Sequence, residues 1–340
     1  MRSQTTCFRS VCSRRGFVLL CCLLTLFMVF SACTVQAKRP AATAGTTGEG
    51  VPGSTPSQEL PQSGMLFWQV TDPETGGTLY LLGSIHAADD SVYPLPQVVT
   101  EAFRYADSLA VEADILALEN DPAALAEVAA MLVYADGTTI QDHLPADLYQ
   151  AAKKQLSDAG VYSAAYEWMK PAMWSSALDN LALEAAGLDS DKGIDLHFLK
   201  QAAQTGKRII EIESAVEQYE MLAGFSDETW TLLMQTAVDD PAGQTEEVKT
   251  MYSIWKSGNF DAFSTYVTAE PEGLSGKEQQ LYAAYQREMI DDRNAGMAQK
   301  AIELLQSAET CFFVVGAAHM AGDTGIVSAL QNAGFTVTQR

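Results

Sequence analysis

Two histidines of this sequence end segments that are similar to each other. His86 closes the segment LYLLGSIH and His319 closes the segment FFVVGAAH, so each follows four apolar residues and a Gly-x-x-His pattern. Two neutral imidazoles can bind a divalent metal, and one carboxylate can complete a three-ligand site with a position open for water. A metal held in this way lowers the pKa of its bound water and polarises a carbonyl. The pair therefore predicts metal-assisted hydrolysis, although each histidine could instead only cap a strand end by bonding to the backbone.

The elements that must position these histidines are two buried strands. A continuous apolar run this short is typical of a strand that is buried on both faces of a sheet. Glycine after the run, Gly83 in the first segment and Gly316 in the second, allows a sharp turn or a close approach. Ligands of open α/β sheets bind just beyond the carboxyl ends of the strands. If the two strands are neighbours, both imidazoles therefore lie in one pocket.

Carboxylates follow a third predicted strand. Glu112 ends the strand predicted at residues 108–112, which we expect beside the strand that ends at Gly83. Asp114 lies two positions further on and faces the same way. Glu112 is therefore the first candidate for a metal ligand or general base, and Asp114 is the second. The alternative is a solvated carboxylate at a strand end.

A second acidic pair follows a fourth predicted strand, at residues 207–212. Glu211 and Glu213 share one face by the two-residue period of a strand. Two nearby carboxylates can share one proton and act as acid and base, which makes both Glu211 and Glu213 candidates for proton transfer. Ser214 and Glu217 have the spacing of a helix capping box, which explains part of this stretch without catalysis.

One arginine is a further candidate for the same site. Arg293 lies within a long helix predicted at residues 277–308. A buried arginine can form a structural ion pair, or it can hold a substrate carboxylate in the fork of its guanidinium. We favour the structural ion pair, with Glu112, Glu213 or a helix neighbour such as Asp291 as its partner, because buried ion pairs fix geometry.

The predicted elements indicate an α/β fold. Strands are predicted at residues 65–70, 78–83, 108–112, 207–212, 311–315 and 335–338, and helices at residues 94–106, 122–134, 145–159, 166–186, 193–205, 227–237, 244–255, 277–308 and 324–333. Strands dominate the two ends of this region, and helices dominate its middle. The economical arrangement is one domain, residues 65–340, whose sheet is formed from N- and C-terminal segments with a large helical insertion between them.

The first 64 residues are predicted to lie outside this domain. Residues 1–32 contain arginines, then an apolar stretch and small residues before Cys33, an order that resembles a bacterial lipoprotein signal. Cys33 would then carry lipid and anchor the chain at the extracytoplasmic face of the cell membrane; the alternative is an uncleaved membrane anchor. Residues 33–64 are rich in Ala, Thr, Gly, Pro and Ser and are predicted to form a disordered tether.

Composition argues against several classes of function. The formal net charge is −22, and the first 32 residues contain four arginines and no acidic residue, so their removal makes the charge more negative. Phosphate backbones repel such a chain, and we therefore expect no nucleic-acid partner. The sequence has no Walker loop, so nothing in it supports nucleotide binding, and no Gly-x-Ser-x-Gly elbow, so nothing supports serine hydrolysis. Cys311 is the only cysteine after Cys33, so the mature chain can form no internal disulfide.

An ordered set of short segments resembles the TraB/GumN family, whose more distant relatives include the Tiki proteins, described as metal-dependent peptidases. The segments are YLLGSIH and YPLP, then VEAD, GID, IES, RN and finally VGAAH, which ends at His319. The resemblance covers most of residues 66–340. It implies an α/β domain with one site built from the two Gly-x-x-His segments.

The resemblance also implies roles for the candidate residues. His86, His319 and Glu112 would bind a divalent metal such as manganese, cobalt or zinc. Glu213 would move protons, and Arg293 would orient the substrate or the developing charge. The substrates implied are peptides at the cell surface. A competing hypothesis is a non-catalytic binding protein that sequesters a secreted peptide or signal, and a third is a scaffold in envelope assembly.

Overall fold

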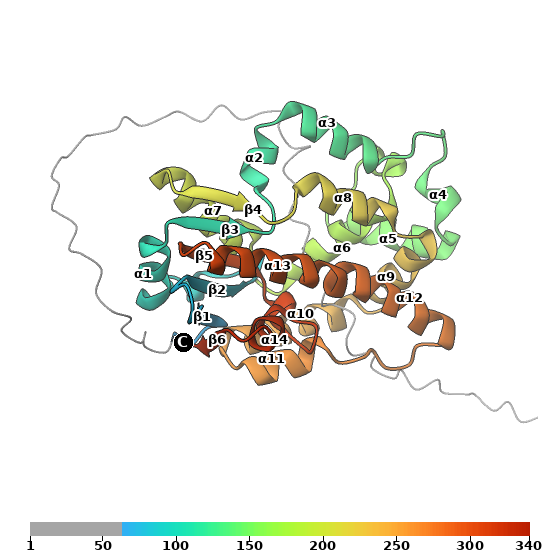
Figure 1. The fold of residues 1–340 in the computed structure, drawn as a ribbon. Helices are drawn as coiled ribbons and strands as arrows, with labels where there is room; N and C mark the ends of the chain where they lie inside the picture. Colours follow the sequence, from blue (N-terminus) through green and yellow to red (C-terminus); the bar gives the residue numbers. More distant parts are fainter. Residues whose placement is uncertain (1–62) are drawn as a thin grey trace, which may run out of the picture.

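A six-stranded sheet forms the centre of the computed structural model, which describes residues 63–340 (Figure 1). The strands are β1 (Phe67–Thr71), β2 (Thr78–Ser84), β3 (Ser108–Val111), β4 (Arg208–Glu211), β5 (Thr310–Gly316) and β6 (Thr336–Gln339). They lie in the order β4-β3-β5-β2-β1-β6. The predicted signal segment and Cys33 lie outside the described residues, as does the predicted tether apart from its last two residues.

The two apolar runs that precede the histidines are neighbours in this sheet, as expected. β2 and β5 pair in parallel, from Thr78 opposite Thr310 to Ser84 opposite Gly316. β3 pairs in parallel with β5 and β4 with β3, whereas β1 is antiparallel to both β2 and β6. The carboxyl ends of β2, β5, β3 and β4 therefore meet at one edge of the sheet.

The position of β3 differs from the prediction. β3, which precedes Glu112, does not lie beside β2, because β5 lies between the two strands and pairs with both. The connection from β2 to β3 runs through α1 (Gln97–Tyr105) and leaves a gap of one strand between them. β5, from the C-terminal part of the chain, occupies that gap. Glu112 therefore enters the site next to Gly316 and not next to Gly83.

Helices make up most of the remaining described chain. They are α2 (Ile115–Glu119), α3 (Pro122–Met131), α4 (Ile140–His143), α5 (Ala146–Asp158), α6 (Pro171–Ala185), α7 (Ile194–Thr205), α8 (Ala215–Gly224), α9 (Asp227–Asp239), α10 (Pro241–Lys256), α11 (Phe260–Val267) and α14 (Ile326–Asn332), with the α12 to α13 stretch given below. Ser214 and Glu217 form the predicted capping box at the start of α8. The short helices α2 and α4 were not predicted, because so few residues show no clear 3.6-residue period. The helix α11 was also not predicted, although its buried residues Phe263 and Val267 have helical spacing. Between residues 63 and 340 no helix is both long and apolar enough to cross a membrane.

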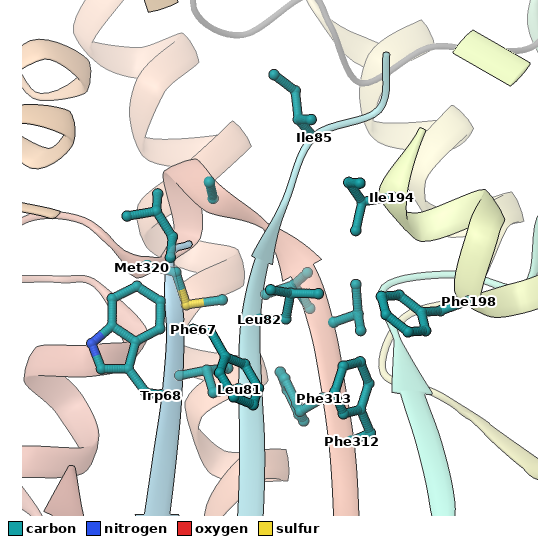
Figure 2. Close-up of a cluster of buried hydrophobic side chains, with 14 of the residues drawn as sticks. Phe67, Trp68, Leu81, Leu82, Ile85, Ile194, Phe198, Phe312, Phe313 and Met320 are labelled. Carbon is teal, nitrogen blue, oxygen red and sulfur yellow. The ribbon is translucent and has the colours of Figure 1, made fainter. Parts of the chain in front are cut away.

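Two hydrophobic cores hold these elements together. The first is built on the sheet, and Figure 2 shows Phe198 of α7 beside Phe312 of β5, whose ring centroids are 4.7 Å apart. The second lies among the helices and contains Trp174, Trp230 and Tyr285. The prediction of an α/β fold is thus confirmed. The helical insertion has a core of its own, and β4 divides it into two parts along the chain.

One helical stretch connects the two cores. α12 (Gly276–Gln286) continues through the π-helical turn η5 (Arg287–Asp291) into α13 (Asp292–Gln306), at the position of the long predicted helix. Met289 belongs to the helical core, whereas Met297 and Leu305 belong to the sheet core. Figure 1 shows α13 running from the sheet towards α9 and α12. The π-helical turn therefore lies where the stretch passes from one core to the other, directly before Arg293.

Candidate active site

Three side chains from three neighbouring strands surround Gly316 at the carboxyl edge of the sheet. A Cβ atom placed on Gly316 would lie 3.6 Å from Nε2 of His86, 3.7 Å from Cδ2 of His319 and 3.1 Å from Oε1 of Glu112. His86 follows β2, Glu112 follows β3, and His319 lies in the turn η6 (Ala317–Met320) directly after β5. The structure thus brings together the three residues that were predicted to bind metal. The missing side chain of glycine leaves the space between them open.

His86 is held at one ring nitrogen and free at the other. Its Nδ1 lies 2.8 Å from Oδ2 of Asp195, and the other carboxylate oxygen of Asp195 accepts a hydrogen bond from the hydroxyl of Ser84. Its Nε2 is buried and has no hydrogen-bond partner. Burial opposes the charged form of this imidazole, but the charges of Asp195 and Glu112 outweigh that effect and raise the pKa of His86 to about 9.

His319 has the same arrangement with a neutral partner. Its Nδ1 lies 2.7 Å from Oδ1 of Asn294, and its Nε2 is buried without a hydrogen-bond partner. The side chain is 1% exposed. Burial lowers the pKa of His319 to about 3, although the charge of Glu112 acts in the opposite direction. His319 is therefore neutral, and the bond from Nδ1 to Asn294 leaves the lone pair on Nε2, facing the site.

Glu112 is an ionised carboxylate in a buried position. Its Oε1 accepts a hydrogen bond of 2.5 Å from the backbone N–H of Gly316 and lies 3.8 Å from Nε2 of His319. Its Oε2 accepts a hydrogen bond of 2.7 Å from Arg293. Burial alone would raise the pKa of Glu112, but His319, Arg293, His86 and the Gly316 N–H together lower it to about 2. Glu112 therefore carries a negative charge and does not act as a proton donor near neutral pH.

Arg293 lies between two carboxylates. Its guanidinium donates to Oε2 of Glu112 at 2.7 Å and to both carboxylate oxygens of Glu213 at 2.7 to 3.1 Å, and its Nη1 donates to the carbonyl of Met289. The amide of Gln218 donates to Glu213 at 3.1 Å. The structure therefore pairs Arg293 with Glu112 and Glu213, two of the three partners that were expected for a structural ion pair, and the arginine side chain is only 9% exposed.

Two acidic residues that were expected near the site lie apart from it. Asp114 caps the start of α2, where its carboxylate accepts from the N–H of Ala117 at 3.0 Å. Glu211 is exposed and accepts from the backbone N–H of Asp114 at 2.7 Å. Asp114, the second candidate for a metal ligand, is thus a helix cap, because α2 begins shortly after Glu112.

Two residues of the site were missed by reasoning from sequence. Asp195 and Asn294 hold the Nδ1 atoms of His86 and His319, yet neither was assigned a role. Each belongs to one of the quoted segments, GID and RN. The presence of a polar residue in each of these two family segments could therefore have pointed to Asp195 and Asn294 as site residues. The partner of each residue becomes apparent only when α7 and α13 are packed against the sheet.

The donor set fits a divalent metal ion provided that His86, which its pKa of about 9 keeps protonated near neutral pH, gives up its proton when the metal binds. Two imidazole Nε2 atoms without partners and one carboxylate oxygen lie around an open point, and Asp195 and Asn294 orient the rings from behind. As the side chains stand, however, no group of three or more His, Cys, Asp or Glu within residues 63–340 is arranged to hold a metal. Oε1 of Glu112, which is turned to the N–H of Gly316, is the donor that would have to shift.

A small pocket of about 50 Å³ reaches His86 and Glu112. The residues that line it are His86, Val111, Glu112, Ala113, Ile115, Ser190, Asp195, Leu196, Leu199 and Gln218. This volume has room for about two water molecules, and polar and apolar side chains contribute in equal number to the walls. The pocket can therefore hold a water or a small reacting group but not a peptide.

Comparisons with known proteins place these features in a wider group. The chain is 25% identical over 332 residues to "Metalloprotease TIKI1" of Danio rerio, covering 84% of this chain and 64% of that protein. It is 25% identical over 305 residues to "Metalloprotease TIKI2" of Xenopus tropicalis, covering 76% and 57%. It is 27% identical over 173 residues to "Uncharacterized protein YbaP" of Escherichia coli (strain K12), covering 50% and 61%.

The TIKI relatives are longer than this chain, whereas the family model matches almost all of the described residues. The chain spans about three fifths of the length of the curated relatives it matches, and no solved structure matches it. The model of the TraB/PrgY/gumN family, in contrast, matches residues 66–339, which include every residue of the site described above. The chain belongs to the TraB/PrgY/gumN family.

Proposed function

We propose that this chain is a metal-dependent hydrolase that acts on peptides. The observation that carries the proposal is the pair of buried Nε2 atoms of His86 and His319, which have no hydrogen-bond partner and belong to two rings that both reach within 3.7 Å of the position of a Cβ atom at Gly316. A buried nitrogen without a partner costs free energy unless a ligand satisfies it. The relatives named as metalloproteases support the same reaction class.

The residues have distinct roles in this proposal. Nε2 of His86, Nε2 of His319 and one oxygen of Glu112 would hold the metal, which when bound supplies a water of lowered pKa and polarises a carbonyl. Asp195 and Asn294 keep the two rings in place through their Nδ1 atoms. Arg293 keeps Glu112 ionised and fixed between β3 and α13.

The contacts of Arg293 and Glu213 bear on the roles that the resemblance implied for them. Each nitrogen of the Arg293 guanidinium already has a partner in Glu112, Glu213 or Met289. We therefore propose that Arg293 positions Glu112 and does not bind the substrate directly. Glu213 could move protons only after its hydrogen bonds with Arg293 break. Glu112 would keep its own hydrogen bond with Arg293.

A non-catalytic binding protein is the second candidate. The pairing of both carboxylates with Arg293 favours it, because a hydrolase needs a base near the water. A binding protein saturates at one ligand per chain, whereas a hydrolase turns over many. Product formed from a peptide mixture, counted per chain, therefore separates the two.

Metal content tests the proposal directly. The full-length chain, purified in detergent and without metal resins, is equilibrated with manganese, cobalt and zinc, and bound metal is counted by elemental analysis. We expect about one ion per chain in the parent and only traces in the folded double variant His86→Ala/His319→Ala. His143→Ala/His197→Ala is the matched control, since neither of these histidines lines the site pocket. Equal trace metal in all three proteins would exclude the metal mechanism and favour the binding protein.

We further propose that lipid on Cys33 anchors the chain at the extracytoplasmic face of the cell membrane. The order of arginines, apolar stretch and small residues before Cys33 supports this location. The parent chain should begin at a Cys33 that carries lipid, as measured by mass spectrometry, and Cys33→Ser should lack the lipid mass. A parent chain that carries no lipid and retains residues 1–32 in the membrane fraction would instead have an uncleaved anchor.

A further inference from the structure

A second, much larger pocket lies beside the turn that carries His319. Its volume is about 660 Å³, which is within the usual range of small-molecule and peptide side-chain sites. Its walls come from three parts of the chain: the α11–α12 connection with α12 itself, the π-helical turn η5, and the turn η6 with the residues that follow it. None of the residues that line it also lines the small pocket at His86.

This pocket contacts the backbone that positions the site. Ala318 and Ala321, which lie in its wall, stand on either side of His319 in the chain. Asp291, also in the wall, ends η5 two residues before Arg293, and its carboxylate accepts a hydrogen bond of 2.6 Å from Thr324. A ligand here would therefore lie against the two segments that present His319 and Arg293.

The lining has the chemistry of a peptide-binding surface. Leu274, Tyr282 and Ile290 supply apolar area, and Gln279, Gln280 and Gln286 supply amides that can bond to a peptide backbone. Oε1 of Gln286 is shielded from solvent and has no hydrogen-bond partner, so it can accept a hydrogen bond from an N–H group of a ligand. These features suit a ligand with backbone N–H groups and apolar side chains.

The charge of the lining selects among such ligands. Glu270 and Asp291 are the charged residues of the wall, and none of the described residues that line the pocket is Lys, Arg or His. The chain as a whole adds a formal net charge of −22. A cationic segment is therefore attracted, and an acidic segment is repelled.

We propose that this pocket binds an extended peptide segment that carries both apolar and positively charged side chains. We assign it as the place where the substrate of the hydrolase is held, an assignment that rests on the proposed function. The small pocket at His86 and Glu112 then receives only the reacting group, which agrees with its volume of about 50 Å³.

Binding of defined peptides tests this proposal without any turnover. Three fluorescein-labelled hexapeptides of the pattern Ala-X-Leu-Ala-X-Leu, with X as Lys, Ser or Glu, are titrated with metal-free full-length chain in non-ionic detergent, and fluorescence anisotropy is corrected for detergent alone. We expect the Lys peptide to bind at least about tenfold more tightly than the Glu peptide at low salt. The variant His86→Ala/His319→Ala should bind the Lys peptide as the parent does, so failure of the metal site and failure of the pocket are distinguishable.

Variants of the wall locate the binding. Ala283→Trp, at an exposed position of α12 that lines the pocket, should abolish binding by filling the space. Glu270→Gln with Asp291→Asn should weaken the Lys peptide about tenfold and leave the Ser peptide unchanged. Glu127→Gln is the matched control for lost charge, since it lies exposed on α3 and does not line the pocket.

Three results would overturn the proposal. Equal affinity for the Lys and Glu peptides would remove the charge argument, and affinity unchanged by Ala283→Trp would place the binding elsewhere. Lys38 and Arg39 form a basic pair shortly after Cys33 that could itself occupy an acidic pocket. If the parent bound the Lys peptide weakly and Lys38→Ser/Arg39→Ser bound it tightly, the pocket would belong to this segment of the chain and not to a substrate.

Discussion

The two glycines of the Gly-x-x-His segments meet different surroundings. A Cβ atom on Gly83 would lie 3.2 Å from Cα of Ala317 and 3.3 Å from Cβ of Leu66, so this glycine allows close packing of β2. A Cβ atom on Gly316 would instead enter the space between His86 and Glu112. The same residue type therefore serves packing in one segment and an open site in the other.

Gly316→Ala should preserve the fold and impair the site. The backbone at Gly316 has φ −51° and ψ 136°, which any residue adopts, so the substitution brings no backbone strain. The added methyl group would lie 3.1 Å from Oε1 of Glu112 and should lower bound metal at least about tenfold. Elemental analysis with circular dichroism checks both parts.

The control for this change lies on α13. Gly296 is exposed in the helix with no atom within 4 Å of an added Cβ, so Gly296→Ala should stabilise the fold by about 0.5–1 kcal/mol and leave metal binding intact. Parent-like metal content in Gly316→Ala would contradict the view that this glycine keeps the site open.

Loss of Arg293 should cost much of the stability of the fold. Its side chain is 9% exposed and Glu112 is 8% exposed, so removing the guanidinium leaves buried carboxylates without a counter-charge. We expect Arg293→Ala to lower the free energy of unfolding by about 3–5 kcal/mol, measured in urea. Arg287→Ala should cost less than about 1 kcal/mol, because its contact with Asp292 is long, at 3.9 Å, and exposed.

The triple variant Arg293→Met/Glu112→Gln/Glu213→Gln removes all three charges together. It should recover much of the lost stability while still failing to bind metal, since the carboxylate ligand is gone. A small effect of Arg293→Ala alone would mean that water reaches the two carboxylates and that the ion pair does not hold the site.

At the scale of elements, the π-helical turn η5 sets the rotation between the two halves of the longest helical stretch. Tyr285 and Met289 face the helical core before and within the turn, and Asn294 and Met297 face the sheet core and site after it. Each residue of an α-helix advances by about 100°, so one residue more or less changes which side chains face each core. Turns of this kind occur often at functional sites.

Deletion of Glu288, an exposed residue of η5, tests this geometry. If the turn becomes α-helical, Arg293 and Asn294 rotate away from their partners or the helical core loses Tyr285. We expect the free energy of unfolding to fall by at least about 2 kcal/mol, together with loss of metal binding. Glu288→Ala keeps the residue count and should behave as the parent; a deletion variant that also does so would show that the turn carries no such constraint.

A second element-scale contact joins α5 to the turn η3 (Ala164–Trp168). Glu167 accepts from Lys153 at 2.6 Å and from Tyr149 at 2.8 Å, and it also accepts from Tyr162. Burial alone would raise the pKa of Glu167, but these donors lower it to about 2 from an ordinary value of 4.5. The carboxylate of Glu167 is thus more acidic in the folded chain than in the unfolded chain.

This shift predicts a specific acid dependence. The stabilisation from Glu167 is fully present above about pH 4.5 and is lost as the pH falls towards 2, because the unfolded chain takes up the proton first. In Glu167→Gln, the free energy of unfolding should therefore fall less steeply between these two pH values than in the parent. Glu127→Gln on α3 serves as the control, and an identical slope in Glu167→Gln and the parent would contradict the assignment.

Across the whole molecule, local patterns predicted the strands and the two histidines but not their companions. The short apolar runs before Gly83 and Gly316 carry a clear signal, because strands buried on both faces need uninterrupted apolar residues. The place of β5 between β2 and β3 depends on the order of distant segments, which no local pattern contains. The roles of Asp195 and Asn294 depend in turn on that order, and so remained unpredicted.

The excess of acidic residues acts on the molecule as a whole. Besides the paired carboxylates at the site, the formal net charge of −22 is spread over many exposed acids, which repel one another more strongly in the compact state than in the unfolded chain. Raising NaCl from about 10 mM to about 500 mM shortens the Debye length from about 30 Å to about 4 Å and should raise the free energy of unfolding.

Urea unfolding at the two salt concentrations measures this effect, and an uncharged osmolyte series separates screening from exclusion of solute. The repulsion between Glu112 and Glu213 that Arg293→Ala leaves behind is buried, and salt screens buried charges poorly. We therefore expect added salt not to restore the free energy of unfolding that Arg293→Ala loses. If added salt instead lowered the stability of the parent, favourable pairs such as Arg293 with Glu112 and Glu213 would outweigh the repulsion between exposed acids. In that case the balance of attraction over repulsion would govern the fold.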